Sequence, residues 1–323
     1  TSLHPKQINI KNIRLEFIPQ IGLGIRGFMH WQFRGESLGG ESPAWGLIHP
    51  DGSARPVTKA VREWQKLLAP YEESLMKHSA TKPKVAIWKS RKNEIFHFAA
   101  HHNLDSLAAS VEGYANALYR SSIPCCYIDH QILSESKLGG IKFLIMPCAY
   151  YLTQVEADSL DEWIREGGVL LCDAHLAGYS DSGRHSQTLP GCGLADKWDI
   201  YETDTTASIH LNQAYENLHG DKEIAPDVRK SLEHFGTGGG RYYQIHLDNG
   251  KSLSGCSRVA FLEAKDGQVE GRLASGEALI VSKRIGKGKI IYAGSNIGEG
   301  GLNEPEKLRY FLNELLSENG ITA

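Results

Sequence analysis

The 323-residue sequence lacks long apolar runs and a strong charge of either sign. No stretch approaches the roughly 20 uninterrupted apolar residues that span a bilayer, and the segment after Thr1 lacks the basic-then-apolar layout of a signal peptide. With 35 basic and 38 acidic side chains the net charge is −3, so no large electrostatic term favours nucleic acid or an anionic membrane. We therefore expect a globular protein without a nucleic-acid or membrane partner. The chain does not begin with Met, which indicates a processed or excised polypeptide.

Cysteines with metal-site spacing are also missing. No CxxC motif or Cys/His pair has zinc spacing, and several cysteines lie within apolar runs, where free thiols are commonly buried. This usage favours a reducing, cytoplasmic compartment, although loop cysteines such as Cys192 could still pair in an oxidising one. We expect no metal and no cofactor. The six cysteines are Cys125, Cys126, Cys148, Cys172, Cys192 and Cys256.

Phosphate-binding and zinc motifs are absent in the same way. GTGGGR at 236–241 lacks the Lys-Ser/Thr of a P-loop, and RIGKGK at 284–289 joins two predicted strands where a Rossmann fingerprint would open a helix. Both are interpreted as turns or loops. His97, His101 and His102 lack HExxH spacing, so they are expected at a solvated helix entry rather than at zinc.

Strands alternate with helices over residues 79–323. The strands are short and nearly all apolar, which is typical of a parallel sheet covered on both faces. We predict a doubly wound, mostly parallel α/β sheet that ends in antiparallel strands, the last two forming a hairpin. Thr153 and Glu156 have capping-box spacing at the start of one helix. The predicted strands are 84–88, 125–128, 142–146, 168–172, 259–262, 277–283 and 289–293, and the predicted helices are 104–119, the one opened by Thr153, 225–234 and 305–316.

Residues 1–78 are too poor in predicted elements to enclose a core. GIRGFMHWQF at 24–33 predicts a strand, and apolar residues at helical spacing predict a helix over 55–68. One strand and one helix look like the end of a larger domain, whose other strands supply the missing pairing.

Cys148 follows a predicted central strand, where some α/β enzymes carry a nucleophile. The run IMPCAYYL lacks the glycines of a strained nucleophile elbow, so a packed, inert thiol is favoured. Asp173 and His175 follow the next strand, where turn chemistry is the simpler interpretation.

Residues 27–53 carry the most suggestive chemistry. Carboxylate, amide and guanidinium groups can bind sugar hydroxyls, and an aromatic face can stack on a pyranose. From residue types alone, a carbohydrate site competes with a structural turn over core aromatics. The candidate residues are Trp31, Gln32, Arg34, Glu36, Glu41 and Trp45.

The same residues carry a family resemblance. WQFRGESLGGESPAWG resembles the end of the catalytic barrel in glycoside hydrolase family 42, the β-galactosidases. Later blocks resemble that family's trimerisation domain: KPKVAIW, IKFLIMPCAYYLT, DEWIREGGVLLCDAHLAGYSD, LPGCGLADKWDIYETD and RIGKGKIIYAGS. The resemblance implies that residues 1–78 are the last strand, loop and helix of a TIM barrel. It also implies that 79–323 form a flavodoxin-like, class I glutamine amidotransferase-like trimerisation domain without the amidotransferase triad.

The resemblance also implies roles for individual residues. Gln32 and Arg34 match the pattern of barrel strand 8, and Glu41 matches a loop glutamate that hydrogen-bonds galactose. Ala44, followed by Trp45, stands where the family has His, which puts galactose specificity in doubt while still favouring a pyranoside.

The two catalytic glutamates of the family lie on barrel strands 4 and 7, which have no counterpart here. Glu16 lies in a helix-like run, and Glu36 and Glu41 share one loop, so neither arrangement supplies two carboxylates about 5 to 5.5 Å apart on rigid supports. The resemblance implies a retaining β-galactosidase-like parent and a homo-oligomer, a trimer in this family, whereas this stretch alone is expected to be inactive. A non-catalytic carbohydrate-binding or assembly protein and a Cys-dependent amidotransferase-like enzyme stay open as alternatives.

Overall fold

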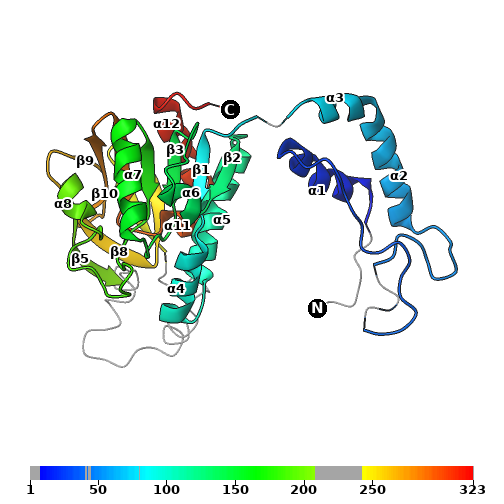
Figure 1. Ribbon diagram of the computed structural model, residues 1–323, viewed down its shortest axis with the longest axis horizontal. Helices are drawn as coiled ribbons and strands as arrows, with labels where there is room; N and C mark the ends of the chain where they lie inside the picture. The colour runs from blue at the N-terminus through cyan, green and yellow to red at the C-terminus, as the bar shows by residue number, and fades with distance from the viewer. Residues whose placement is uncertain (1–7, 41, 43–44, 80, 208–241, 323) are drawn as a thin grey trace. The chain divides into compact units, whose positions relative to one another are not determined.

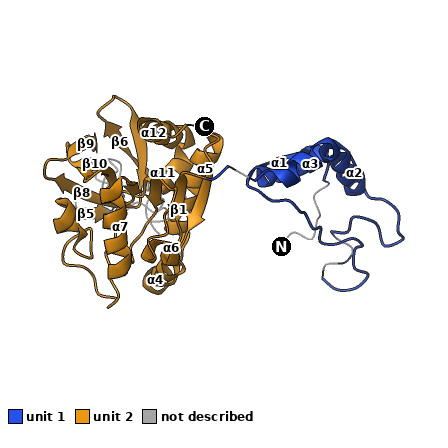
Figure 2. Ribbon diagram, turned by 45° about the horizontal axis from the view of Figure 1, so that its top comes forward, with its two compact units in different colours: residues 1–82 blue, residues 83–323 orange. Residues whose placement is uncertain are grey.

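The structure is a computed structural model that describes residues 8–40, 42, 45–79, 81–207 and 242–322 (Figure 1). The predicted helix at 225–234 and the glycine cluster at 236–241 lie outside these residues. The chain divides into two compact units, Thr1–Lys82 and Pro83–Ala323 (Figure 2).

Unit 1, the first of these, is built around two helices. Asn9 caps α1 (Ile10–Gly22), and Pro56 opens α2 (Pro56–Leu68) at a position that suits its fixed φ. A small core forms where Phe17 of α1 stacks on Phe28 at 4.1 Å and meets the edge of Trp64 at 5.9 Å. The prediction of a helix over 55–68 is therefore confirmed. A short 3₁₀ turn (Ala69–Tyr71) and α3 (Glu72–Lys77) follow.

The predicted strand over residues 24–33 is wrong as a regular element. The structure assigns no strand there, and only an isolated bridge joins Arg34 to Ile48. A strand needs a neighbour for its backbone hydrogen bonds, and the described residues of unit 1 provide no second strand beside this segment.

Unit 2 contains the large sheet. Within the described residues, nine strands form one sheet in the order β2-β1-β3-β4-β11-β10-β9-β6-β7. The five strands from β2 to β11 run parallel, and the remaining pairs are antiparallel. The predicted parallel sheet with an antiparallel end is confirmed. The nine strands are β1 (Val85–Trp88), β2 (Cys125–Ile128), β3 (Phe143–Met146), β4 (Val169–Cys172), β6 (Tyr242–Leu247), β7 (Ser252–Cys256), β9 (Gln268–Arg272), β10 (Ala278–Ile285) and β11 (Gly288–Ala293).

The helices of unit 2 are α4 (Arg91–His101), α5 (Asp105–Arg120), α6 (His130–Ser134), α7 (Gln154–Glu166), α8 (Leu194–Trp198), α11 (Ile297–Asn303) and α12 (Pro305–Glu318). The predicted capping box forms, with Thr153 and Glu156 exchanging side-chain-to-backbone hydrogen bonds of 2.8 and 3.2 Å. A separate antiparallel pair joins β5 (Ile200–Ala207) to β8 (Arg258–Ala264). The hairpin between β10 and β11 turns at Gly286, whose φ of 59° is readily available to glycine.

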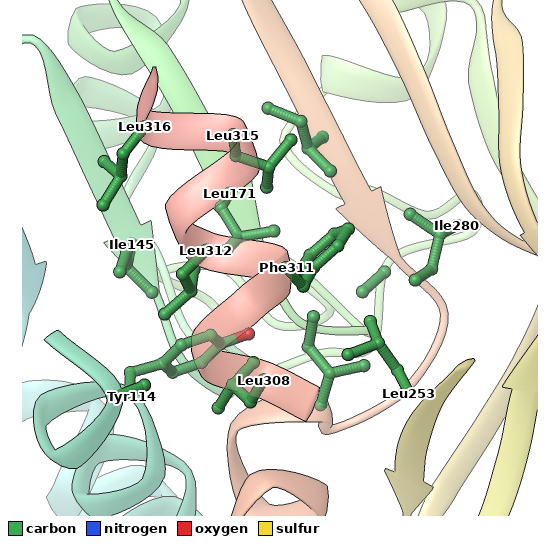
Figure 3. Close-up of a cluster of buried hydrophobic side chains, with 14 of the residues drawn as sticks. Tyr114, Ile145, Leu171, Leu253, Ile280, Leu308, Phe311, Leu312, Leu315 and Leu316 are labelled. Atoms are coloured by element: carbon green, nitrogen blue, oxygen red, sulfur yellow. The ribbon is translucent and has the colours of Figure 1, made fainter. Parts of the chain in front are cut away.

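The sheet has an apolar core on each face. Successive strand residues point to opposite faces, so Phe143 and Ile145 join the core that contains α5 and α12, whereas Leu144 and Met146 join the core that contains α6 and α7. Helix α12 contributes Leu308, Phe311, Leu312, Leu315 and Leu316 to the first core (Figure 3). Because both faces are covered, the central strands β1, β3 and β4 are apolar throughout.

The expected solvated entry at the histidine cluster is wrong for His97. This residue lies inside α4, is 3% exposed, and its Nε2 lies 3.0 Å from the carbonyl oxygen of Cys148. His102 ends the helix with φ 57°. The tertiary hydrogen bond, which the local pattern does not encode, draws the ring inward.

Candidate functional site

The segment before the glycine-rich loop has two different sides. Phe28, His30 and Gln32 are partly buried, and the first two rings lie 4.1 and 5.8 Å from the ring of Phe17. Met29, Trp31 and Phe33 alternate with them and are 97%, 74% and 67% exposed. One side thus packs on the helices, while the other presents a row of large apolar side chains to solvent.

Backbone hydrogen bonds close the loop that follows. The amide of Gln32 donates to the carbonyl of Trp45 at 3.2 Å, and the amide of Leu47 donates to the carbonyl of Gln32 at 2.9 Å. The Trp31–Gln32 peptide bond is cis. Gly46 lies where the two ends of the loop cross, since a Cβ there would overlap the backbone nitrogen of Gly35. The loop is therefore tied at its base by main-chain contacts.

The structure brings some of the predicted sugar-binding residues together and separates others. Gln32 and Trp45 meet at the base of the loop, Trp45 with φ 46° and 38% exposure. Trp31 is exposed, whereas Gln32 is partly buried. The Nε2 of Gln32 is buried and has no hydrogen-bond partner among the described residues.

Acidic groups near the loop do not form a described pair. Glu36 is exposed, and Glu41 and Ala44 lie outside the described residues. Glu16 is exposed on α1, in agreement with its helix-like sequence context. Arg34 is exposed, and its guanidinium group lies beside Gly52.

Cys148 lies at the carboxyl end of β3, fully buried and with φ 41°. This backbone conformation is unusual for a non-glycine residue, although no glycine flanks it. Its Sγ lies 3.5 Å from Ser110 Oγ and 3.8 Å from Asp173 Oδ2. Burial raises the pKa of the thiol well above its usual range, and the carboxylate of Asp173 adds to that effect. Burial and a raised pKa are the properties of an unreactive thiol.

Asp173 is the centre of a buried polar cluster. Its Oδ1 accepts a hydrogen bond of 2.6 Å from Tyr114 Oη, and its Oδ2 accepts one of 3.3 Å from the amide of Cys148. Burial raises the pKa of Asp173 to about 6, an effect that the hydrogen bonds from Tyr114, Ser110 and Cys148 partly offset. These hydrogen bonds come from residues 25 and 59 positions away, so they are tertiary contacts that the turn-chemistry interpretation did not include.

His175 belongs to a second network that the sequence did not indicate. Arg258 Nη1 donates to His175 Nδ1 at 2.8 Å, so the neutral imidazole carries its proton on Nε2. The amide of His175 donates to Glu202, which also accepts a hydrogen bond of 2.7 Å from Tyr292 Oη. Burial raises the pKa of Glu202. These four residues are up to 117 positions apart, so only the fold relates them.

The crevice where strand order reverses, between β1 and β3, is occupied by the chain itself. Asn93 Nδ2 donates to the carbonyl of Cys148 at 3.1 Å, and Asn93 Oδ1 accepts from the amide of Tyr151 at 3.0 Å. His97 reaches the same carbonyl. Ligands of doubly wound folds usually bind in this crevice, so α4 fills the usual ligand position.

Within the described ranges, no helix is both long and apolar enough to cross a membrane. Likewise, no group of three or more His, Cys, Asp or Glu side chains in that part of the chain is placed to hold a metal ion.

Unit 2 is thus a mixed α/β unit with a large sheet, and unit 1 carries Trp31, Gln32, Arg34 and Glu36 on or beside a tied loop. Comparison with known proteins shows that the chain resembles glycoside hydrolases. The chain is 22% identical over 291 residues to β-galactosidase YesZ of Bacillus licheniformis. The aligned region covers 88% of this chain and 38% of YesZ. No protein-family model matches it.

Solved β-galactosidases share the fold. The match to the enzyme of the psychrophilic Marinomonas ef1 has a TM-score of 0.69 at 15% sequence identity. It covers 96% of this chain and 41% of the Marinomonas chain. The match to a catalytic mutant of Gan42B, a family 42 β-galactosidase from G. stearothermophilus, has a TM-score of 0.68 at 16% sequence identity. It covers 95% of this chain and 40% of the Gan42B chain. The resemblance to family 42 β-galactosidases is thereby confirmed over about nine-tenths of the chain. The chain spans about two-fifths of the length of these relatives.

Proposed function

We propose that this chain is part of a retaining β-galactosidase-like glycoside hydrolase. Residues 1–78 would be the last strand, loop and helix of its (β/α)₈ barrel, and 79–323 its oligomerisation domain. The catalytic acid and the nucleophile would lie on other strands of that barrel. The similarity to β-galactosidases, which extends over only 38–41% of their length, supports this proposal.

The observation that carries the proposal is the two-sided segment at residues 28–33. In a (β/α)₈ barrel, alternate residues of each strand face the outer helices and the interior. Phe28 and His30 contact Phe17 of α1, whereas Met29, Trp31 and Phe33 are exposed. A monomeric soluble unit rarely leaves such an apolar row uncovered. The remaining strands of a barrel would cover it and provide the missing backbone pairing.

Within such a barrel, the predicted sugar-binding residues would have distinct tasks. The indole of Trp31 would stack on a pyranose ring, while Gln32 and Arg34 would bind hydroxyl groups. The loop would bring Glu36, Glu41 and Trp45 toward the same galactoside.

The topology of unit 2 supports the finer assignment of a flavodoxin-like trimerisation domain. Its parallel strands have the order β2-β1-β3-β4-β11, which matches the 2-1-3-4-5 order of flavodoxin-like sheets.

Expression of the complete coding region tests the function. We expect the complete protein to hydrolyse p-nitrophenyl β-D-galactopyranoside with retention, as seen by NMR of the first-formed anomer, and this 323-residue chain to be inactive alone.

Replacing Trp31 by Ala in the complete protein should raise KM on the order of tenfold, because it removes a stacking contact. Tyr71→Ala, which removes another exposed ring of unit 1, is the matched control. Hydrolysis of galactosides by the isolated chain, or no hydrolysis by the complete protein, would refute the proposal.

A further inference from the structure

A groove runs beside α12 in unit 2. Its volume is about 740 Å³, within the range of small-molecule sites, and its floor includes the buried side chains of Ile123, Leu316 and Ile321. Two smaller cavities of about 310 and 80 Å³ adjoin it, and Glu314 lines all three. Glu314 therefore lies at the border of the three cavities.

One wall of the groove is a polar face of α12. Tyr310, Asn313, Glu314 and Ser317 follow i, i+3, i+4 and i+7 spacing, which places them on one side of the helix. The other side of α12 lies on the sheet (Figure 3). Since the core fixes the helix, it also fixes the positions of these polar groups.

The opposite wall is the turn between β6 and β7, which is tied to α12. Asn249 Oδ1 accepts a hydrogen bond of 3.0 Å from the amide of Lys251, and Asn249 Nδ2 donates to Glu314 Oε2 at 3.2 Å. Lys251 forms an ion pair with the same carboxylate. These contacts hold the groove open in a defined shape without a ligand.

Most of the charges at the groove are paired. Lys251 pairs with Glu314, and Lys289 lies 3.7 Å from Glu270 and 3.9 Å from Glu318. Two lysines thus face three carboxylates, and the one negative charge left over disfavours an anion. Neutral hydrogen-bonding groups remain available.

Those available groups suit hydroxyls. The side chains of Asn313 and Ser317 make no hydrogen bond within the part of the chain that the structure describes. Tyr310 is 53% exposed, although the guanidinium carbon of Arg309 lies over its ring, 4.6 Å from the centroid. Amide and hydroxyl groups next to an exposed aromatic ring match the alternating polar and apolar surface of a sugar.

We propose that this groove binds a neutral saccharide, with a sugar ring on Tyr310 and hydroxyl groups on Asn313, Glu314 and Ser317. The site requires nothing from unit 1 and so extends beyond the proposed function. Only the choice of a galactoside as the probe rests on that function.

Saturation-transfer NMR with lactose on the full 323-residue chain tests the proposal. The Trp31→Ala variant serves as the background, so that the predicted site of unit 1 makes no contribution. Adding Tyr310→Ala should weaken lactose binding about tenfold or abolish its signals. Tyr127→Ala, an equally exposed (53%) tyrosine on β2 outside the groove, should leave binding unchanged. Asn313→Ala is a second variant in the groove. It should also weaken lactose binding while its thermal unfolding stays unchanged.

Three results would overturn the groove site: no lactose binding up to about 50 mM in the Trp31→Ala background, unchanged binding after both groove substitutions, or equal loss in the Tyr127→Ala control. Failure here leaves the hydrolase proposal intact, because hydrolysis is measured on the complete protein. Conversely, lactose binding that depends on Tyr310 stands even if the complete protein has no galactosidase activity.

Discussion

At the scale of single residues, the buried Asp173 carboxylate makes stability depend on pH. Its pKa is about 6 in the folded chain and near the ordinary 3.8 in the unfolded chain, so the folded state binds more protons between these values. Stability is therefore highest below about pH 4 for this group and falls as pH rises through 6, by up to roughly 3 kcal/mol. Asp173→Asn, which cannot ionise, should flatten this fall, as measured by urea unfolding at pH 4, 5, 6 and 7.

Asp158→Asn is the matched control for this experiment. Asp158 is exposed, and hydrogen bonds from Lys197 and Gln154 lower its pKa, so its contribution has the opposite sign. The control should retain the decline between pH 4 and 6. An unchanged decline in Asp173→Asn would show that another group is responsible, and Glu202, whose pKa is also raised by burial, is the first to test.

Residue chemistry was predictable from the sequence only where it is local. The absence of glycines around Cys148 indicated an inert thiol, and the thiol is fully buried. The partners of Asp173 and His175 were beyond such reasoning, because Tyr114, Glu202 and Arg258 reach them from distant elements. The two sides of residues 28–33 are visible as alternation in the sequence, but which side the helices cover depends on Phe17.

At the scale of elements, apolar runs and helical periodicity located β1 to β4, α5, α7, α12 and the final hairpin. They missed β7, because its sequence SLSGC consists of small and partly polar residues. Contacts with the neighbouring strand and with α11 bury this strand, so its own hydrophobicity does not reveal it. They predicted a strand at residues 24–33 because its composition suits a sheet, whereas forming one requires a neighbour. Long-range pairing decides both cases.

Close packing between α5 and α11 provides an element-scale prediction. Gly113 and Gly298 allow the two backbones to approach so closely that a Cβ on Gly113 would overlap the carbonyl oxygen of Gly298. Gly113→Ala should therefore lower the free energy of unfolding by about 3 kcal/mol, since neither backbone can move without disturbing the core. Gly139→Ala, with nothing within 4 Å of its Cβ, should change it by less than about 0.5 kcal/mol. Equal urea midpoints for the two variants would contradict this packing account.

At the scale of the whole molecule, two kinds of association must be distinguished. The proposed oligomerisation domain predicts a defined trimer with three times the 35.7 kDa mass of this chain. The exposed row of Met29, Trp31 and Phe33 predicts instead a non-specific association through unit 1. Both would raise the sedimenting mass, so mass alone does not separate them.

Charge placed in the exposed row separates the two kinds. Met29→Lys with Phe33→Lys should suppress association through unit 1, because two cations cannot be buried against a second apolar surface without a large desolvation cost. A trimer held by unit 2 should survive these substitutions in sedimentation velocity at micromolar concentration. Ser37→Lys, at an exposed polar position of the same unit, controls for added charge. A monomeric mass for the doubly substituted chain would contradict the trimer and leave the apolar row as the sole source of association.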